Sequence, residues 1–501
     1  MLQSIIRPVL ALSIFVYLVG LTSKAFALAP LVSKEDGDQW RSIGRLSGSL
    51  ACTGFLIDLQ QGDNNPAQVL TNGHCVRDFG RTQTMSEVIM DLDIRGLGYS
   101  ITFDFFYDQS VKTEFPIARI SYATMKSVDL AVLELDVSLL ELKELGIKPL
   151  YLSGRQMFER EPVKVVGAPI FSDDGLDYLR LAECEYIGTS DVLEWNWFWS
   201  NSIVTDCSSI AEGSSGSPII DSYGNVIGMI NTSTATAKST ETCYLGHPCE
   251  VMVTGTEMVK NRSYGPKLFA IQGCFVRGRF DVYQSGCQLD PGSPVEVTMA
   301  VPTPHNGRPS VFDDPVWSIQ MQGLTQGFYY KSGPIQLVDC QSDDGYSDLQ
   351  PARSNILDLL PLPDETGAFV TCIRLAQLEN SRSFDFPIVV PVVIDRTGPD
   401  EMPIASLLRR GAESIWFEPL FSVPELSGYL FQVTDDPSDP CDVDLMRFYI
   451  RIPITLDVND LPTKVCIQTE DNAGNLGLVW EYVVESVMVQ DRYQLSPVRA
   501  L

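Results

Sequence analysis

The sequence predicts an all-β protein, and three observations support this fold class. From Gln39 to Gln272, short runs of β-type residues alternate with Gly, Asp and Asn turns, as in sheets built from many short strands. Convincing amphipathic helices are few. The exception is Asp136 to Leu145, where leucines at 139, 140, 142 and 145 fit one short helix or helical turn. After residue 295, two sections repeat one spacing of tryptophan and cysteine, as two tandem domains would.

Length and composition limit the possible functions. A chain of 501 residues suggests about three domains of roughly 100–200 residues each. With 45% hydrophobic and 20% charged residues, it is not wholly disordered. The formal charge of −28 argues against a nucleic-acid partner and against docking on anionic lipid, because both favour basic surfaces. We therefore expect protein or peptide partners. The composition specifies no oligomeric state.

The first 27 residues predict export from the cytoplasm. Arg7 precedes an apolar run from Pro8 to Leu21, and Ala25-Phe-Ala27 follows as a small-x-small cleavage site. This pattern is typical of a secretory signal peptide cleaved after about Ala27. An uncleaved anchor is the alternative, but the run is short for a membrane span of about 20 residues. We expect a secreted or periplasmic protein without stable membrane insertion.

The twelve cysteines predict disulfides, because an even count in an exported chain is typical of them. Metal binding is the competing use, but there is no Cys-x-x-Cys pair and only three histidines, so zinc-type spacing is absent. Twelve cysteines allow many pairings. The simplest set joins neighbours in sequence: Cys52 with Cys75, Cys184 with Cys207, Cys243 with Cys249, Cys274 with Cys287, Cys340 with Cys372, and Cys441 with Cys466.

The three histidines narrow the search for chemistry. His247 lies in a small cysteine-flanked loop and His305 in a turn-rich linker, and both are most simply surface residues. His74 differs, because it follows a strand-like run that ends at Thr71 and directly precedes Cys75. A bond from Cys75 to Cys52 would join two strands and hold the imidazole at a strand end.

An acid and a serine complete the pattern. Asp129 opens the apolar strand Leu130 to Leu135, where an acid alone is usually a turn residue. Ser215 lies between Gly213 and Gly216, in a run that would ordinarily be a turn. These glycines permit a backbone path that points successive N–H groups into one concavity, as an oxyanion hole requires.

The histidine, the acid and the serine are much stronger evidence of function together than apart. A serine hydroxyl is a poor nucleophile until an imidazole takes its proton, and the imidazole needs a carboxylate that fixes its tautomer. The chain order here is His74, Asp129, Ser215. This is the chymotrypsin order, whereas subtilisin-like and α/β-hydrolase-like enzymes use other orders.

Thr71-Asn-Gly-His74-Cys75, Asp129-Leu-Ala-Val-Leu and Gly213-Ser-Ser-Gly-Ser-Pro218 resemble the three signature blocks of chymotrypsin-like (trypsin-fold) serine endopeptidases, most of all the bacterial glutamyl-endopeptidase branch. The resemblance runs from Gln39 to Gln272. It implies a protease domain at 28–272 that consists of two six-stranded antiparallel β-barrels. It also implies that His74 is the general base, Asp129 its orienter and Ser215 the nucleophile, with the backbone N–H groups of Gly213 and Ser215 as the oxyanion hole.

The resemblance also places the substrate pocket. It puts Ser209, six residues before the nucleophile, at the pocket base, and it implies a wall of Ile210, Asn231, Thr232 and Ser233. These residues are uncharged, so we expect apolar or small side chains at P1. Trp195, Trp197 and Trp199 alternate at period two, which places them on one strand face. Packing is the favoured interpretation for them, and a substrate platform is the alternative.

The remaining chain predicts accessory domains. A disulfide clip and linker occupy 273–294, and the two sections at 295–396 and 397–485 resemble immunoglobulin-like β-sandwiches. Because each section has its own cysteine pair, we expect each to close its own core. Residues 486–501 have no clear pairing pattern and predict a C-terminal tail. No cofactor is required. Acids near the cysteines are candidates for Ca²⁺, but solvated turns are favoured: Asp343, Asp344, Asp348, Asp435, Asp436, Asp439, Asp442 and Asp444.

Two functions from different classes follow. The first is an active secreted serine endopeptidase. The second is a non-catalytic adhesion or binding protein built on a protease-like domain. The presence of His74, Asp129 and Ser215 within the glycine frame favours the enzyme.

Overall fold

The computed structural model describes residues 28–77, 84–170, 172, 174–235, 243–299, 317, 319–352, 360–400, 403–409, 413–420, 426–449, 453–489 and 492–500. The predicted signal peptide at 1–27 and His305 lie outside these residues. The all-β prediction is confirmed, because strands form almost all of the regular structure in the described ranges. In these ranges, none of the helices is both long and apolar enough to cross a lipid bilayer.

The first barrel is a closed ring of six antiparallel strands in the order β6-β5-β1-β2-β3-β7, and β7 pairs back with β6. A seventh strand, β4, lies on the outer side of β6. The strands are β1 Ile43–Ser47, β2 Ala51–Ile57, β3 Pro66–Thr71, β4 Val88–Asp93, β5 Ser100–Phe103, β6 Thr113–Thr124 and β7 Leu130–Ser138.

The second barrel follows the order β12-β11-β8-β9-β10-β16, and a bridge between Gly228 and Lys267 joins its two ends. Strand β13 pairs with β16, and the hairpin β14–β15 extends the sheet beside β9. The strands are β8 Glu161–Gly167, β9 Arg180–Glu194, β10 Trp197–Thr205, β11 Pro218–Ile220, β12 Val226–Met229, β13 Thr232–Ser233, β14 Cys249–Met252, β15 Gly255–Glu257 and β16 Ser263–Gly265. Two antiparallel barrels are what the sequence resemblance implied.

Helices are short. The helix expected between Asp136 and Leu145 is confirmed as α3 Leu139–Glu144, where Ser138 and Glu141 form a capping box. The α-helix α1 Gly73–Val76 carries His74. The other helices within the described residues are 3₁₀ turns: η1 Asp38–Trp40, η2 Phe269–Cys274, η4 Ala376–Leu378, η5 Arg382–Asp385, η6 Val443–Leu445 and η7 Val458–Asp460.

All twelve cysteines are paired, and every predicted pair is confirmed. The bonds join Cys52–Cys75, Cys184–Cys207, Cys243–Cys249, Cys274–Cys287, Cys340–Cys372 and Cys441–Cys466. The first bond links β2 to α1, as expected from the position of Cys75 beside His74.

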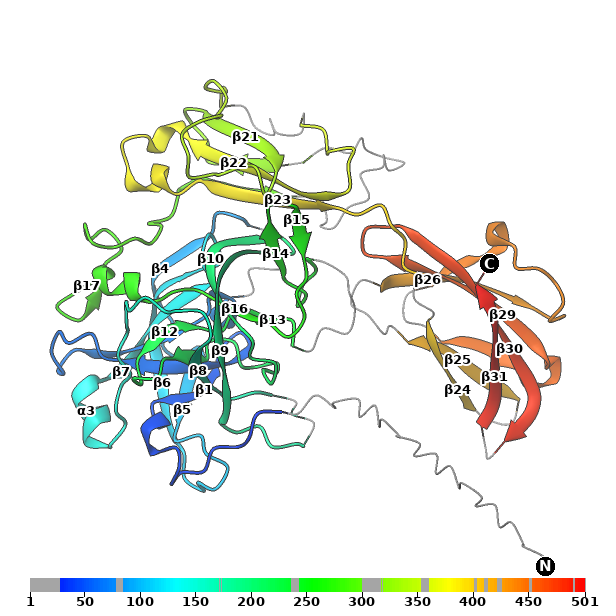
Figure 1. Ribbon diagram of the computed structural model, residues 1–501, viewed down its shortest axis with the longest axis horizontal. Helices are drawn as coiled ribbons and strands as arrows, with labels where there is room; N and C mark the ends of the chain where they lie inside the picture. Colours follow the sequence, from blue (N-terminus) through cyan, green and yellow to red (C-terminus); the bar gives the residue numbers. More distant parts are fainter. Residues whose placement is uncertain are drawn as a thin grey trace, which may run out of the picture.

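Section 295–396 does not close a core of its own, so that expectation is wrong. Val297 and Ile319 belong to the same buried cluster as Leu46 and Val69 of the first barrel and Trp199 of the second. Figure 1 shows β21–β23 lying across one end of the barrels. The strands after the second barrel are β17 Phe275–Val276, β18 Arg279–Phe280, β19 Glu296–Met299, β20 Ile319–Gln322, β21 Phe328–Pro334, β22 Gly367–Leu375 and β23 Ile388–Ile394.

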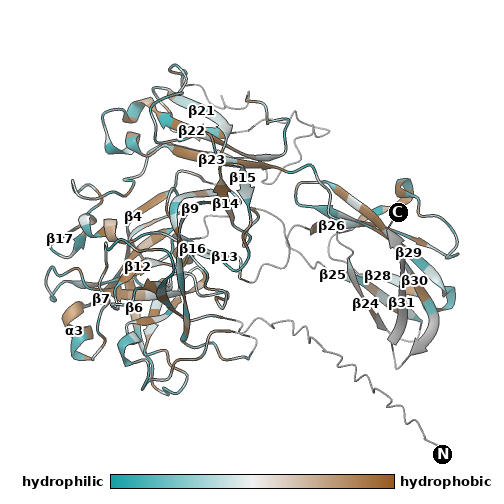
Figure 2. Cartoon of the chain, in the orientation of Figure 1, coloured by the Kyte–Doolittle hydropathy of each residue, from teal (hydrophilic) through white to brown (hydrophobic). Residues whose placement is uncertain are grey.

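The last section has a separate core that includes Ile415, Phe417, Tyr429 and Tyr482, and it stands apart from the barrels in Figure 1. Its two sheets follow the orders β24-β25-β28 and β27-β26-β29-β30-β31. The strands are β24 Ile404–Arg409, β25 Ser414–Leu420, β26 Leu426–Thr434, β27 Arg447–Tyr449, β28 Ile454–Asp457, β29 Thr463–Asp471, β30 Leu476–Val489 and β31 Arg492–Ala500. Figure 2 shows hydrophobic residues concentrated on strands and hydrophilic residues in most loops.

The prediction of a tail at 486–501 is wrong for most of that segment. Strand β30 continues to Val489, and β31 pairs with it antiparallel, from Trp480 opposite Ala500 to Val489 opposite Arg492. The apolar run 487–489 and the alternating Tyr493 and Leu495 are short, and no Asn-Gly, Asp-Gly or Gly-Gly pair lies between them, so the sequence does not signal this hairpin. The immunoglobulin-like character of both C-terminal sections stays a prediction.

Candidate active site

His74 and Asp129 are held together by main chain and side chain. His74 Nδ1 lies 2.6 Å from Asp129 Oδ2, and the His74 backbone N–H donates to Asp129 Oδ1 at 3.1 Å. The Asn72 side chain donates to the Asp129 carbonyl at 3.0 Å. Only glycine fits at Gly73, because a Cβ there would lie 2.2 Å from the Thr124 carbonyl oxygen. The bend between β3 and α1 therefore depends on that glycine.

This pairing fixes the chemistry of the imidazole. The Asp129 side chain is fully buried and, as a carboxylate, only accepts, so Nδ1 carries the proton and Nε2 is left with a lone pair. Burial works to lower the pKa of His74. The charge and hydrogen bond of Asp129, with the charge of Glu194, outweigh burial and raise that pKa above its ordinary value. A protonated His74 is therefore stabilised, as a general base requires after it takes a proton.

Ser215 lies in a turn that both barrels hold. The Thr53 N–H of β2 donates to the Ser215 carbonyl at 2.8 Å, and the Ser215 hydroxyl donates to the Asn231 carbonyl at 3.3 Å. Gly216 has φ +86°, and a Cβ there would lie 2.1 Å from the Thr53 carbonyl oxygen. A larger residue would push the nucleophile turn off the first barrel.

The peptide bond between Glu212 and Gly213 fixes the direction of the Gly213 N–H. The Glu212 carbonyl accepts from the Ile170 N–H at 2.8 Å, so the planar peptide turns the Gly213 N–H the opposite way. The Gly213 carbonyl accepts from Thr53 Oγ1 at 3.1 Å. In the described part of the chain, neither the Gly213 N–H nor the Ser215 N–H donates to a protein acceptor. Both are available for a developing oxyanion.

His74 and Ser215 line one pocket of about 470 Å³. Of the five predicted pocket residues, Ile210, Asn231, Thr232 and Ser233 line it, whereas Ser209 is not part of its wall. The other lining residues are Leu50, Met125, Glu194, Trp195, Trp197, Trp199, Ala211, Glu212, Ile230, Leu245 and Gly246.

The tryptophans pack in the core and also line the pocket, so packing is confirmed for Trp197 and Trp199 and a substrate platform stays a prediction. Trp197 and Trp199 are buried members of the main core, and all three tryptophans line the pocket. Trp195 does not share their strand face, because it lies in the turn before β10 with φ +51°.

Glu194 is a site residue that the sequence reasoning missed. It is 5% exposed, lines the pocket, and its Oε1 accepts from the Gly246 N–H at 2.6 Å. Burial raises the pKa of Glu194, although hydrogen bonds from Gly246 and Thr232 and the charge of His74 oppose the shift. An acid at the end of the apolar run Val192-Leu193 was the available signal.

One other interpretation changes, and it concerns a histidine. His247 is 6% exposed, so the expectation of a surface residue is wrong; the disulfide loop folds it inward. Among the described residues, Cys52, His74 and Cys75 form the one group with metal-ligand geometry, but both cysteines are in a disulfide, which leaves no thiolate to bind a metal. Asp343 pairs with Arg374 at 2.5 Å. For the acidic loops, solvated turns stay the favoured prediction and calcium binding the alternative.

Comparison with known proteins agrees with the geometry. Residues 52–229, about a third of the chain, match the family described as trypsin-like peptidase domain. This segment contains His74, Asp129 and Ser215, and it is similar to trypsin-like peptidase domains. The protein is thus a serine-type endopeptidase by class.

Solved structures of serine proteases are also similar to this chain. A Glu endopeptidase is 16% identical, with 48% of this chain and 91% of that chain covered and a TM-score of 0.28. The serine endoprotease from Yersinia pestis is 13% identical, with 48% and 64% covered and a TM-score of 0.27. A thermostable serine protease from an extremophilic microorganism is 13% identical, with 46% and 92% covered and a TM-score of 0.30. No curated protein matches significantly. At these TM-scores, the assignment rests on the family match and the barrels.

Proposed function

We propose that this protein is a secreted endopeptidase that cleaves peptide bonds through His74, Asp129 and Ser215, by way of an acyl-enzyme. The observation that carries the proposal is the 2.6 Å contact between His74 Nδ1 and Asp129 Oδ2, with Ser215 on the same pocket. Nε2 of His74 takes the Ser215 hydroxyl proton as Oγ attacks the scissile carbonyl carbon.

The carbonyl π electrons move to the oxygen, and the N–H groups of Gly213 and Ser215 stabilise that oxyanion. When the carbon–nitrogen bond breaks, His74 gives the proton to the leaving amine. Water then attacks the ester, His74 takes a proton from the water, and Ser215 regains it as the carboxylic acid product leaves. The Ser215 hydroxyl donates to the Asn231 carbonyl in this structure. In this proposal it turns to donate to His74 when substrate binds, since catalytic hydrogen bonds commonly tighten only then.

An uncharged P1 residue fits the wall of Ile210, Asn231, Thr232 and Ser233. Two carboxylates, those of Glu194 and Glu212, also line the pocket, and they disfavour an acidic side chain there. This argues against glutamyl specificity. Export remains part of the proposal because six disulfides suit an oxidising compartment.

Hydrolysis of an unfolded protein substrate by the Ser215→Ala and His74→Ala variants tests the proposal. Both should lose nearly all turnover, and Ser215→Ala should keep the wild-type melting temperature, while Ser208→Ala, a change at an exposed neighbouring serine, should keep full activity. If wild-type and Ser215→Ala proteins turn over equally, the enzyme proposal fails. If neither has any activity, the non-catalytic binding protein is favoured.

A further inference from the structure

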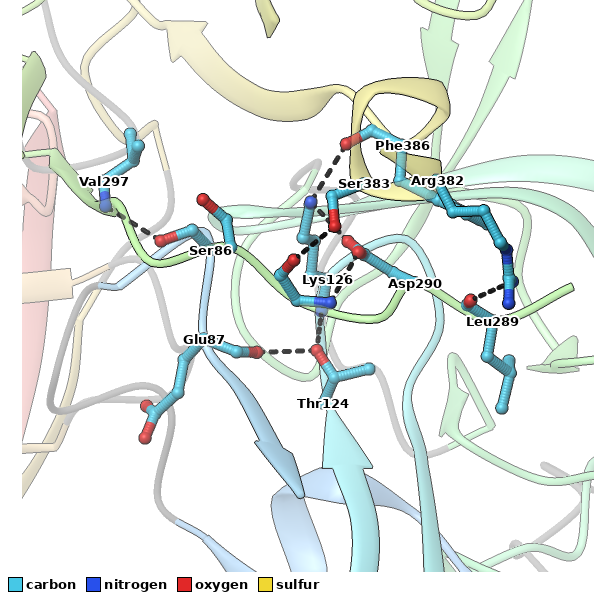
Figure 3. Close-up of polar contacts among 12 residues, drawn as sticks. Ser86, Glu87, Thr124, Lys126, Leu289, Asp290, Val297, Arg382, Ser383 and Phe386 are labelled. Atoms are coloured by element: carbon cyan, nitrogen blue, oxygen red, sulfur yellow. Dashed lines mark hydrogen bonds and ion pairs between the residues drawn. The ribbon is translucent and has the colours of Figure 1, made fainter. Parts of the chain in front are cut away.

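A buried ion pair lies three residues from the predicted triad. Lys126 and Asp290 have side chains only 3% and 2% exposed, and their charged groups are in direct contact. Lys126 Nζ also donates to the Phe386 carbonyl at 3.0 Å. Figure 3 shows this ammonium between Asp290 and Phe386. One side chain thus joins the loop before Asp129, the linker after the second barrel, and the segment before β23.

Lys126 belongs to the short loop between β6 and β7, and that loop is held on both sides. The Lys126 N–H donates to Thr124 Oγ1 at 2.9 Å, and Thr124 Oγ1 donates to the Glu87 carbonyl at 2.7 Å. The Trp199 indole donates to the Met125 carbonyl at 3.1 Å. Ser127 has φ +62°, a conformation that persists only where the surroundings impose it.

The linker that carries Asp290 is equally fixed. Arg382 of η5 donates to the carbonyls of Cys287 and Leu289 at 2.7 and 2.9 Å, and Ser383 donates to the Gly292 carbonyl at 2.7 Å. The Asp290 carbonyl accepts from the Tyr122 hydroxyl of β6 at 3.2 Å. Asp290 therefore cannot move away from Lys126 without breaking contacts to both the barrel and η5.

A second contact joins the same two parts of the chain. The Val297 N–H donates to Ser86 Oγ at 2.8 Å, and the Val297 carbonyl accepts from the Met85 N–H at 2.8 Å. Strand β19 is thereby fixed beside the segment that leads into β4. The section that follows the barrels packs against the catalytic domain at two places, over a shared core.

We propose that Lys126 and Asp290 are positioning residues for the peptidase reaction. Their ion pair, with the Phe386 carbonyl, fixes the loop that sets Asp129 against His74 and that places Met125 in the pocket wall. The section after the barrels is then a part of the catalytic unit and not an independent spacer. This inference rests on the proposed function, because it assigns the two residues an effect on the His74–Asp129 contact.

The test compares full-length Lys126→Met, Asp290→Asn and the double variant with wild type. Lys464→Met is the matched control, because Lys464 is 4% exposed and pairs with Glu481 in the last section, far along the chain from the site. Each protein is measured well below its melting temperature. Turnover is expressed per active site titrated with a fluorophosphonate, so that unfolded protein does not count.

Lys126→Met should lower kcat by about 10-fold or more, because small displacements of catalytic groups are costly, while KM changes little. Its acid limb in kcat/KM should move to lower pH. Asp129 and Glu194 are the charges that raise the pKa of His74. Removing a nearby positive charge would by itself raise that pKa further, not lower it. A downward shift therefore reports a weakened contact between His74 and Asp129.

The double variant leaves neither charge of this pair buried without its partner, so it should fold even where a single variant does not. It should still have a reduced kcat, because the contact from Lys126 to the Phe386 carbonyl is gone. Lys464→Met should melt at a lower temperature with wild-type kcat per active site.

Wild-type kcat and an unshifted acid limb in Lys126→Met, or wild-type kcat in the double variant, would overturn the inference. An unreactive wild-type protein would instead refute the proposed function.

Discussion

Thr53 of the first barrel holds Gly213 of the second, since its Oγ1 donates to the Gly213 carbonyl at 3.1 Å. The same oxygen accepts from the Ala168 N–H at 2.9 Å, and the Thr53 backbone N–H donates to Ser215. One buried threonine in β2 thus connects the first barrel with both residues assigned to the oxyanion hole.

We predict that Thr53→Val lowers kcat with a smaller change in KM. Valine keeps the volume but leaves the Gly213 carbonyl and the Ala168 N–H without their partner, at about 1–3 kcal/mol for each buried group. Steady-state kinetics and thermal melting measure the effect. Thr189→Val in β9 is the control, because Thr189 is exposed and should tolerate the change. Unchanged kcat in Thr53→Val would mean that the oxyanion turn does not depend on this residue.

The turn glycine gives a sharper comparison. Gly213 and Gly224 both have φ +85°, so alanine introduces similar backbone strain at each. A Cβ at Gly213 would lie 2.8 Å from the Ile170 nitrogen, whereas nothing lies within 4 Å at Gly224. We predict that both variants lose some stability but that only Gly213→Ala loses most of its kcat. Equal kcat in the two variants would contradict the assignment of Gly213 to the oxyanion hole.

Glu194 should set the lower pH limit of activity. Its negative charge helps to raise the pKa of His74, and the base works only when neutral. We therefore predict that Glu194→Gln moves the acid limb of kcat/KM to lower pH and raises relative activity there. Glu250→Gln, in the neighbouring strand β14, is the control. An acid limb that stays in place would show that Glu194 has no electrostatic effect on the triad.

The raised pKa of His74 also determines how the stability of the folded state changes with pH. Because the pKa of His74 is raised on folding, protonated His74 stabilises the folded state fully below its unfolded pKa. This contribution is lost as the pH rises through the folded pKa. Comparing the melting temperatures of wild type and His74→Gln across that window measures it, and the difference should shrink as the pH increases.

The P1 preference can be determined from the ends of the cleavage products. A pocket with Ile210, Asn231, Thr232 and Ser233 in its wall should accept apolar or small P1 residues. Mass spectrometry of peptides from a digested protein mixture should show them at the cleaved bond. A dominant Glu, or a dominant Arg or Lys, at P1 would mean that the pocket assignment is wrong. Glu194 and Glu212 make the basic alternative the more serious one.

The sequence was sufficient to predict candidate catalytic residues, because this chemistry depends on rare residue types in a fixed order. Only three histidines occur, and His74 has a strand before it and a cysteine after it, so its place beside Asp129 could be predicted. The cysteine pairs were also predictable, because each joins neighbours in sequence. The many short strand-like runs separated by Gly, Asp and Asn turns were enough to predict the all-β fold class.

What the sequence did not reveal depends on contacts between distant segments. Glu194 reaches the pocket only because its hairpin folds beside the loop of Gly246. Lys126 and Asp290 are far apart in the chain, and nothing near either residue indicates a buried partner. The repeated tryptophan and cysteine spacing suggested two independent domains, but Val297 and Ile319 pack into the barrel core. A pattern of apolar residues along the chain does not show which part of the fold will bury those residues.

The most direct measurement is the site of covalent labelling by a fluorophosphonate, mapped by mass spectrometry on the wild-type protein. A serine becomes reactive toward this reagent only when a base activates it and an oxyanion hole receives the phosphoryl oxygen. We predict a single adduct on Ser215, absent from Ser215→Ala and strongly slowed in His74→Ala. An adduct on another serine, or equal labelling of wild-type and His74→Ala proteins, would contradict the account.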